Sequence, residues 1–244
     1  MSHTATETAA DWNELLETLV TEDDEPVDNI PSAKQQQLLV VALYDSWTPP
    51  PSEEETEAKR KFLAIANVGL FSSPYNPPLV PDMMLSLDVE VPLDWEKKEH
   101  RSYFIWLHEK APDVAVEIVS NKVGKELDEK LRRYAKLDVT YYVVYDPQRL
   151  LSHDVLRVYE RGFGKRYRRR DDFQLPDVGL SLTLWEGDYE DIPGPWLRWC
   201  EANGNLLLTG AERAAQAEER ATHAEAENAR LREEVARLRV QLRS

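Results

Sequence analysis

Two apolar runs on either side of a charged stretch do most to limit the folds open to this chain. Residues 113–120 (DVAVEIVS) are nearly continuous β-branched apolar sequence, which is typical of a central strand covered on both faces. Residues 140–147 (TYYVVYDP) indicate a second interior strand. Between them, residues 121–139 predict a turn followed by a helix. The order strand, helix, strand favours an α/β fold with a central β-sheet flanked by helices.

Two charged residues stand where this pattern calls for apolar ones. Glu117 interrupts the first strand, on the strand face that the following helix should cover. On a helical wheel of about 100° per residue, Lys130 falls between Tyr134 and Leu137 on the inward, apolar arc, and Glu126 borders that arc. An inward lysine is uncommon unless it is paired. Glu117 and Lys130 alone fit a structural ion pair as well as they fit a functional site.

Asp82 adds a third charged group, because it follows Pro81 at the start of another apolar strand in residues 79–92. If this strand lies beside 113–120, the carboxylates of Asp82 and Glu117 converge, which is costly without a cation between them. Mg²⁺ commonly takes one or two protein carboxylates and completes its shell with water and phosphate oxygens. The set predicts phosphodiester hydrolysis with Mg²⁺ or Mn²⁺ held by Asp82 and Glu117, while Lys130 orients water or neutralises developing charge.

The rest of the chain divides into an acidic tail, one large domain, a connecting segment and a final helix. We expect the tail over residues 1–30, the domain over 31–190 and an irregular, aromatic connection over 191–210. Within the domain the patterns predict a helix, several strands, a basic hairpin and an edge strand. These elements are expected at residues 31–47, 61–73, 79–92, 102–109, 156–170 and 175–187.

Residues 211–244 predict a C-terminal coiled coil. Leu231, Val235, Leu238 and Leu242 follow a spacing of 4, 3 and 4 residues, and the same register places alanines at the earlier core positions. Asn228 falls at an a position, where a buried asparagine can fix the register of a two-stranded coil. We expect this segment to self-associate; the alternative is a single solvated helix, since alanine cores are weak.

Charge and cysteine content restrict the functional classes. The net charge of −15 has the wrong sign for a DNA enzyme, since phosphate neutralisation by Lys and Arg supplies most non-specific affinity. However, residues 161–170 (RGFGKRYRRR) hold six bases, so this hairpin is either a local phosphate-binding surface or a solvated tip. Cys200 is the one cysteine, which excludes an intramolecular disulfide and fits a reducing cytosol. With no apolar run of membrane-spanning length, we expect a soluble, cytoplasmic protein without a small-molecule cofactor.

Four motifs in order carry a family resemblance: PDMMLSL at 81–87, PDVAVEIVS at 112–120, the helix with Lys130 and Tyr134, and DVTYYVVYDP at 138–147. This set resembles the Uma-type family of restriction endonucleases, within the PD-(D/E)XK nuclease superfamily, over roughly residues 31–190. The resemblance implies a restriction-endonuclease-like core, a metal-dependent endonuclease activity on DNA, and metal-binding roles for Asp82 and Glu117.

One departure from the superfamily pattern affects the expected chemistry. The acid-x-lysine motif would place a lysine at position 119, where Val119 stands. The resemblance implies that Lys130 supplies the amine from the following helix instead. An inactive nuclease-fold protein, acting as a binding or assembly module through its coiled coil, remains the alternative, and Val119 and the negative net charge favour it.

Overall fold

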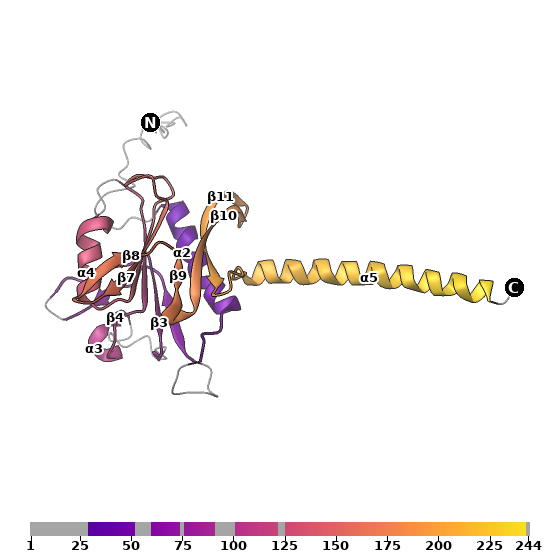
Figure 1. Cartoon of the computed structure of the whole chain (residues 1–244), viewed down its shortest axis with the longest axis horizontal. Helices are drawn as coiled ribbons and strands as arrows, with labels where there is room; N and C mark the ends of the chain where they lie inside the picture. The colour runs from indigo at the N-terminus through magenta and orange to yellow at the C-terminus, as the bar shows by residue number, and fades with distance from the viewer. Residues whose placement is uncertain (1–28, 52–59, 74–75, 91–100, 122–124, 243–244) are drawn as a thin grey trace, which may run out of the picture.

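A six-stranded mixed sheet forms the centre of the fold, and one long helix projects away from it (Figure 1). The computed structural model describes residues 29–51, 60–73, 76–90, 101–121 and 125–242. The acidic tail expected over residues 1–30 lies outside this part of the chain, apart from its last two residues. The mixed α/β sheet flanked by helices confirms the fold class expected from the sequence.

The central sheet has the strand order β1-β3-β5-β6-β7-β8. Only β5 and β6 pair in parallel, and the other neighbours are antiparallel. Every residue of β3, β5 and β6 is buried, which explains their nearly continuous apolar sequences. The bounds of the strands are β1(Phe62–Ile65), β3(Met83–Leu87), β5(Val114–Ile118), β6(Tyr141–Tyr145), β7(Leu156–Gly162) and β8(Arg166–Arg169).

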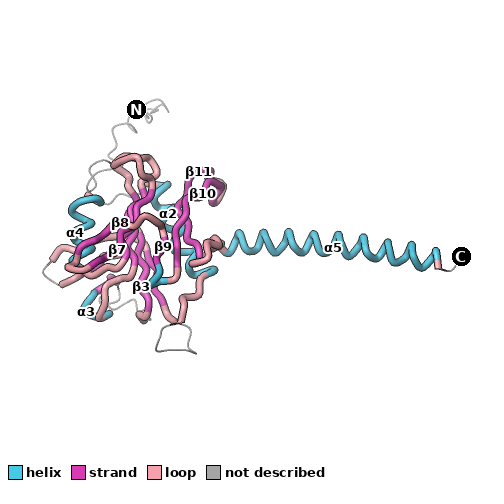
Figure 2. Tube along the Cα trace, in the orientation of Figure 1, coloured by secondary structure: helices cyan, strands magenta, loops and turns pink. Residues whose placement is uncertain are grey.

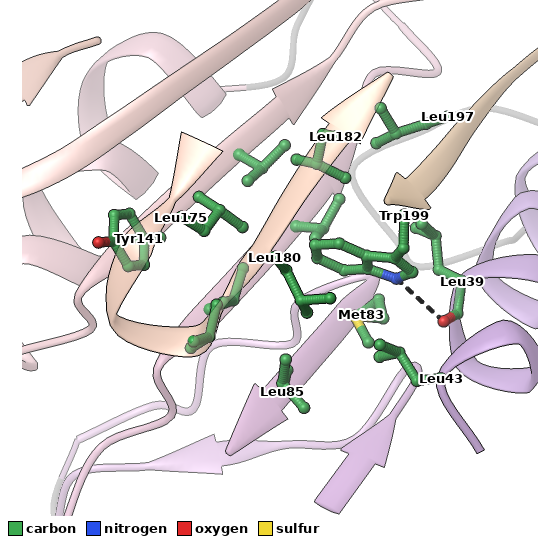
Figure 3. Packing of buried hydrophobic residues seen from close by; sticks show 14 of the residues in the cluster. Leu39, Leu43, Met83, Leu85, Tyr141, Leu175, Leu180, Leu182, Leu197 and Trp199 are labelled. Atoms are coloured by element: carbon green, nitrogen blue, oxygen red, sulfur yellow. Dashed lines mark hydrogen bonds between the residues drawn. The ribbon is translucent and has the colours of Figure 1, made fainter. Parts of the chain in front are cut away.

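One face of the sheet packs against helix α2(Ile30–Ser46) and a second sheet of order β11-β10-β9. Asn29 caps α2 by accepting a hydrogen bond from the Ser32 amide, and a proline occupies its first turn, as is common at helix starts. In the core between the layers, Trp199 donates its indole N–H to the carbonyl of Leu39 at 3.0 Å (Figure 3). The strands of the second sheet are β9(Gln174–Leu175), β10(Leu180–Tyr189) and β11(Ile192–Glu201), with a 3₁₀ turn, η3(Pro176–Val178), after β9.

The opposite face holds the short helices and a small parallel pair of strands (Figure 2). Tyr134, Tyr142 and Val144 belong to its apolar cluster, and Tyr134 stacks on Tyr142 with ring centroids 4.9 Å apart. The elements are η2(Glu126–Lys130), α4(Leu131–Lys136), α3(Ile105–His108), β2(Leu70–Phe71) and β4(Tyr103–Phe104). This face of β5 carries Glu117, because side chains alternate along a strand and Ala115 and Val119 lie in the same cluster.

Two expectations on the second sheet were wrong. Residues 192–201, expected to be irregular, form strand β11 and pair with β10 along its whole length. Residues 175–187 were expected to be an edge strand, but β10 is the middle strand of this sheet. Pro193 and Pro195 lie in the first half of β11, which is an edge strand, where proline is tolerated.

The strand expected over residues 102–109 is also largely wrong. Only Tyr103 and Phe104 are extended, and the chain then forms the single turn α3. None of the residues of α3 is buried. An apolar, aromatic run of this length does not distinguish a strand from a short helix by its pattern.

The C-terminal helix α5(Gly210–Gln241) is confirmed as a helix, and none of its residues is buried. At the usual rise its 32 residues span about 48 Å. Thr209 and Glu212 form a complete capping box at its start, which satisfies two of the free amides there. Arg198 on β11 donates to both carboxylate oxygens of Glu212, at 2.9 and 2.7 Å, so the first turn is attached to the second sheet.

Breaking this attachment should destabilise the fold. Arg198 is 1% exposed and its guanidinium lies 4.9 Å from the Trp185 ring. We expect Arg198→Met to cost about 3 kcal/mol, because it leaves the Glu212 carboxylate without its partner. The thermal midpoint should then fall by about 6 to 12 °C. Arg237→Met, at an exposed position of α5, is the control; equal midpoints for the two variants in a calorimetric scan would contradict the expectation.

Candidate active site

The antiparallel register of β3 and β5 brings Asp82 and Glu117 together. Met83 lies opposite Val116 and Met84 opposite Ala115, so one residue before β3 the same register places Asp82 opposite Glu117. Side chains of directly opposed residues lie on the same face, with Cβ atoms about 4.5–5.5 Å apart. The register thus sets the two residues beside each other at one end of the central sheet, where the charge of Glu117 acts on Asp82.

The carboxylate of Asp82 is held by two hydrogen bonds. The Ile118 amide donates to Oδ2 at 2.6 Å, and the Gln36 side-chain amide donates to Oδ1 at 2.8 Å. Gln36 comes from α2, the helix that covers the other face of the sheet, and is 3% exposed. Asn67 fixes Gln36 in turn by donating to its Oε1 at 2.8 Å. Each Asp82 oxygen keeps a second lone pair for another ligand.

Glu117 lies deeper than Asp82, with 2% of its surface exposed. Lys130 donates to its Oε2 at 2.8 Å, and the Tyr134 hydroxyl donates to its Oε1 at 2.6 Å. Asp82, Glu117 and Lys130, the three residues singled out in the sequence, thus meet at one place. Tyr134 was interpreted as a core residue; it is fully buried, but it also orients the carboxylate.

Lys130 reaches the site from a π-helical turn rather than an α-helical one. Its amide bonds to the Lys125 carbonyl at 3.0 Å, five residues back, a geometry that occurs often at functional sites. Glu126 lies on the same side, with Oε1 3.5 Å from the Lys130 ammonium. Within the described part of the chain, Glu126 Oε2 is a buried oxygen without a hydrogen-bond partner.

Comparison with known proteins identifies the family of this chain. A family model described as "Putative restriction endonuclease", Uma2, matches residues 25–187. The chain belongs to the Uma2 family. A crystal structure from Anabaena variabilis ATCC 29413, titled as "a putative nuclease belonging to DUF820", is 14% identical; the match covers 60% of this chain and 69% of that one, with a TM-score of 0.36. None of the curated proteins matches.

Burial raises the pKa values of both acids at this place in the Uma2-family chain. Burial raises the pKa of Asp82 to about 8, and the negative charge of Glu117 acts in the same direction. Burial also raises the pKa of Glu117, although the ammonium of Lys130 opposes it. Two neighbouring carboxylates with raised pKa values form a site that a cation would stabilise.

Lys130 stays protonated in these surroundings. Its partial burial lowers the pKa, but the carboxylates of Glu117 and Glu126 outweigh that effect and raise the pKa above its ordinary value. The side chain is therefore a donor and a positive charge at neutral pH, and it cannot accept a proton. It can hold an anionic oxygen or orient a water molecule, which are the roles that the sequence assigned to it.

The donor set fits a hard divalent cation that keeps most of its water. Over the described residues, no group of three or more His, Cys, Asp and Glu side chains is arranged to hold a metal ion. Two carboxylates, from Asp82 and Glu117, are what Mg²⁺ or Mn²⁺ commonly takes from a protein when phosphate and water supply its other ligands. The chemistry of the donors thus fits the metal expected from the sequence.

Replacing Lys130 should separate a functional role from a structural one. We expect Lys130→Gln to lower the rate of DNA cleavage about a hundredfold, because it removes a preorganised donor. Metal binding should persist or strengthen, because a positive charge beside the two acids is lost. Lys136→Gln, on the exposed side of α4, is the control. Full activity of Lys130→Gln would leave only the ion pair with Glu117 as its role.

Proposed function

We propose that this protein is an endodeoxyribonuclease that hydrolyses DNA phosphodiester bonds with a divalent metal, Mg²⁺ or Mn²⁺. The observation that carries the proposal is the placement of Asp82 opposite Glu117, with Lys130 bonded to Glu117 at 2.8 Å. Membership of the Uma2 family supports the nuclease class. Such an enzyme acts in the cytoplasm, where the free, buried thiol of Cys200 stays reduced.

Each residue of the site has a separate task. Asp82 and Glu117 would bind the metal, which when bound activates water and stabilises charge on the phosphate. The Ile118 amide and Gln36 fix the direction of the Asp82 carboxylate, and Tyr134 fixes that of Glu117. Lys130, as an ammonium, donates to a phosphate oxygen or to the attacking water and offsets the negative charge that develops there.

The basic hairpin β7–β8 offers a weaker DNA surface than its composition suggested. Arg161 and Lys165 both pair with Asp138, at 3.1 and 2.8 Å. Arg170 pairs with Glu160 at 2.6 Å. Phosphates would have to compete with these acids, so we propose that the hairpin adds to DNA affinity chiefly at low salt.

A cleavage assay tests the proposed function. Supercoiled plasmid incubated with the purified protein should be nicked or linearised with Mg²⁺ or Mn²⁺ and remain intact with EDTA. Cleavage that continues in EDTA would contradict the metal requirement. If no DNA is cut under any of these conditions and millimolar metal does not raise the melting temperature, the nuclease proposal fails.

We also propose that α5 joins two copies of the chain and that the nuclease domain extends to Thr209. The extension of the domain to Thr209 is supported by β11, which pairs with β10 over its whole length, and by Leu207, whose amide donates to the Trp199 carbonyl at 2.9 Å.

None of the described helices is long and apolar enough to cross a membrane.

A further inference from the structure

The outer half of α5 carries an apolar stripe on its surface. Leu231, Val235 and Leu238 are 47, 46 and 51% exposed, and they line or adjoin a shallow groove that also contains Asn228 and Arg232. A helix with no buried residue gains little from tertiary packing, on which most helices in proteins depend. We therefore expect the apolar stripe to pack against another surface. The charges beside the stripe indicate which surface that is.

The charges that flank the stripe are complementary to those of a second copy. With Asn228 at an a position, the g positions carry Arg213, Arg220, Glu227 and Glu234, and the e positions carry Glu218, Glu225, Arg232 and Arg239. In a parallel, in-register pair each g residue faces the e residue of the next heptad on the partner. The four contacts are then Arg213 with Glu218, Arg220 with Glu225, Glu227 with Arg232, and Glu234 with Arg239. All four join opposite charges.

Asn228 favours the same orientation for an independent reason. In a parallel, in-register pair the a residues face each other, so the Asn228 amide meets the same amide on the second helix and the two can hydrogen-bond. In an antiparallel pair an a residue faces a d residue. The d positions of α5 carry no polar side chain (Gly210, Ala217, Ala224, Leu231 and Leu238), which would leave the Asn228 amide buried without a partner.

We infer that two copies of α5 form a parallel, in-register, two-stranded coiled coil. Because the helix start is attached to the fold through Arg198 and Glu212, and the Gly210 amide donates to Asp45 at 2.6 Å, the orientation of the helices is passed to the domains. In one chain the central sheet lies at the start of α5 (Figure 1), so in a parallel pair the two sheets, with their candidate sites, lie at the same end of the coil. This inference goes beyond the proposed nuclease function and does not depend on it.

Cross-linking of the full-length protein tests the orientation. In a Cys200→Ala background, Leu242→Cys places a thiol at a core a position, and Val240→Cys places one on the outer face of the same turn. Mild oxidation should convert Leu242→Cys almost fully to a disulfide-linked dimer and leave Val240→Cys mostly uncoupled. An antiparallel pair would hold the two 242 positions apart by about the length of the helix, so a dimer in solution without this cross-link would overturn the inference.

A charge reversal tests the pairing. Glu227→Arg with Glu234→Arg sets arginine against arginine in the parallel pair, and should weaken dimerisation by at least about tenfold in sedimentation experiments. Adding Arg232→Glu and Arg239→Glu to the same chain restores opposite charges and should restore the dimer. A wild-type protein that is monomeric, trimeric or tetrameric at tens of micromolar, or a reversal that is not rescued, would overturn the inference. A monomer that still cuts DNA would leave the proposed function intact.

Discussion

Glu117→Gln is expected to reduce metal-dependent DNA cleavage by at least about a hundredfold, an effect of the size seen when a preorganised electrostatic group is removed. The side chain is 2% exposed and lies opposite Asp82, so its charge acts on whatever occupies the space between them. Glutamine keeps the shape: its one carbonyl oxygen can accept from Lys130, and its amide NH2 can donate to the Tyr134 hydroxyl, in place of the two bonds of 2.8 and 2.6 Å that Glu117 accepts. The loss should therefore come from the missing charge and not from unfolding.

The experiment needs a folding check and a matched control. Glu129→Gln changes the same residue type on the neighbouring turn, where the carboxylate is half exposed, and should leave cleavage unchanged. Circular dichroism and the melting temperature should show that Glu117→Gln is folded. Asp82→Asn should lose activity to a similar degree. If both variants cut plasmid at the wild-type rate, these two carboxylates do not form the active site.

The site residues that could be predicted from the sequence are the charged ones at positions where the pattern of the strand or helix calls for an apolar residue. Glu117 interrupts a buried strand and Lys130 stands on an inward helical arc, so both violate rules of burial that a single sequence reveals. Asp82 was found because it begins an apolar strand, and the register of β3 with β5 confirmed its placement. The unfavourable positions of these charges made them visible.

Gln36 was missed because it breaks no pattern. A glutamine is an ordinary residue on a helix, and its partner Asp82 is 46 positions away along the chain. The one signal was that Gln35 and Gln36 precede an apolar run, and both prove to be buried. Similarly, the π turn at Glu126–Lys130 has no signature in the sequence. It changes the angle at which Lys130 leaves the helix from the one that an α-helical wheel gives.

Strand β11 was missed because the two halves of its sequence differ in character. Its first half contains Pro193, Gly194 and Pro195, which argue against a strand. Its second half, from Trp196 to Cys200, is wholly buried and provides Trp199 to the core. Nothing local in the sequence shows that the two halves form one element, since the pairing with β10 decides it.

Asp82→Asn is expected to stabilise the metal-free protein at alkaline pH while it removes the response to metal. The pKa of Asp82 is about 8 in the fold against an ordinary value of 3.8, so the folded state binds more protons than the unfolded state between these values. Stability contributed by this group is therefore present at low pH and is lost as pH rises towards about 8. For a fully buried group, such a shift would correspond to about 6 kcal/mol over the whole pH range. Since Asp82 is partly exposed, we expect roughly half of that.

Thermal melts at about pH 5.5 and about pH 8.5 measure this effect. The midpoint of the wild type without metal should fall by roughly 3 to 7 °C between these pH values through this group, and Asp82→Asn should flatten that change. At about pH 8.5 a saturating divalent cation, near a hundred times its dissociation constant, should return about 2.7 kcal/mol to the wild type. The variant should gain almost nothing, because its amide offers no charge to the cation. Asp128→Asn, at an exposed position of η2, should behave as wild type. Equal gains in the wild type and Asp82→Asn would place the metal elsewhere, and an unchanged pH dependence would mean that Asp82 is better solvated than its position beside Glu117 implies.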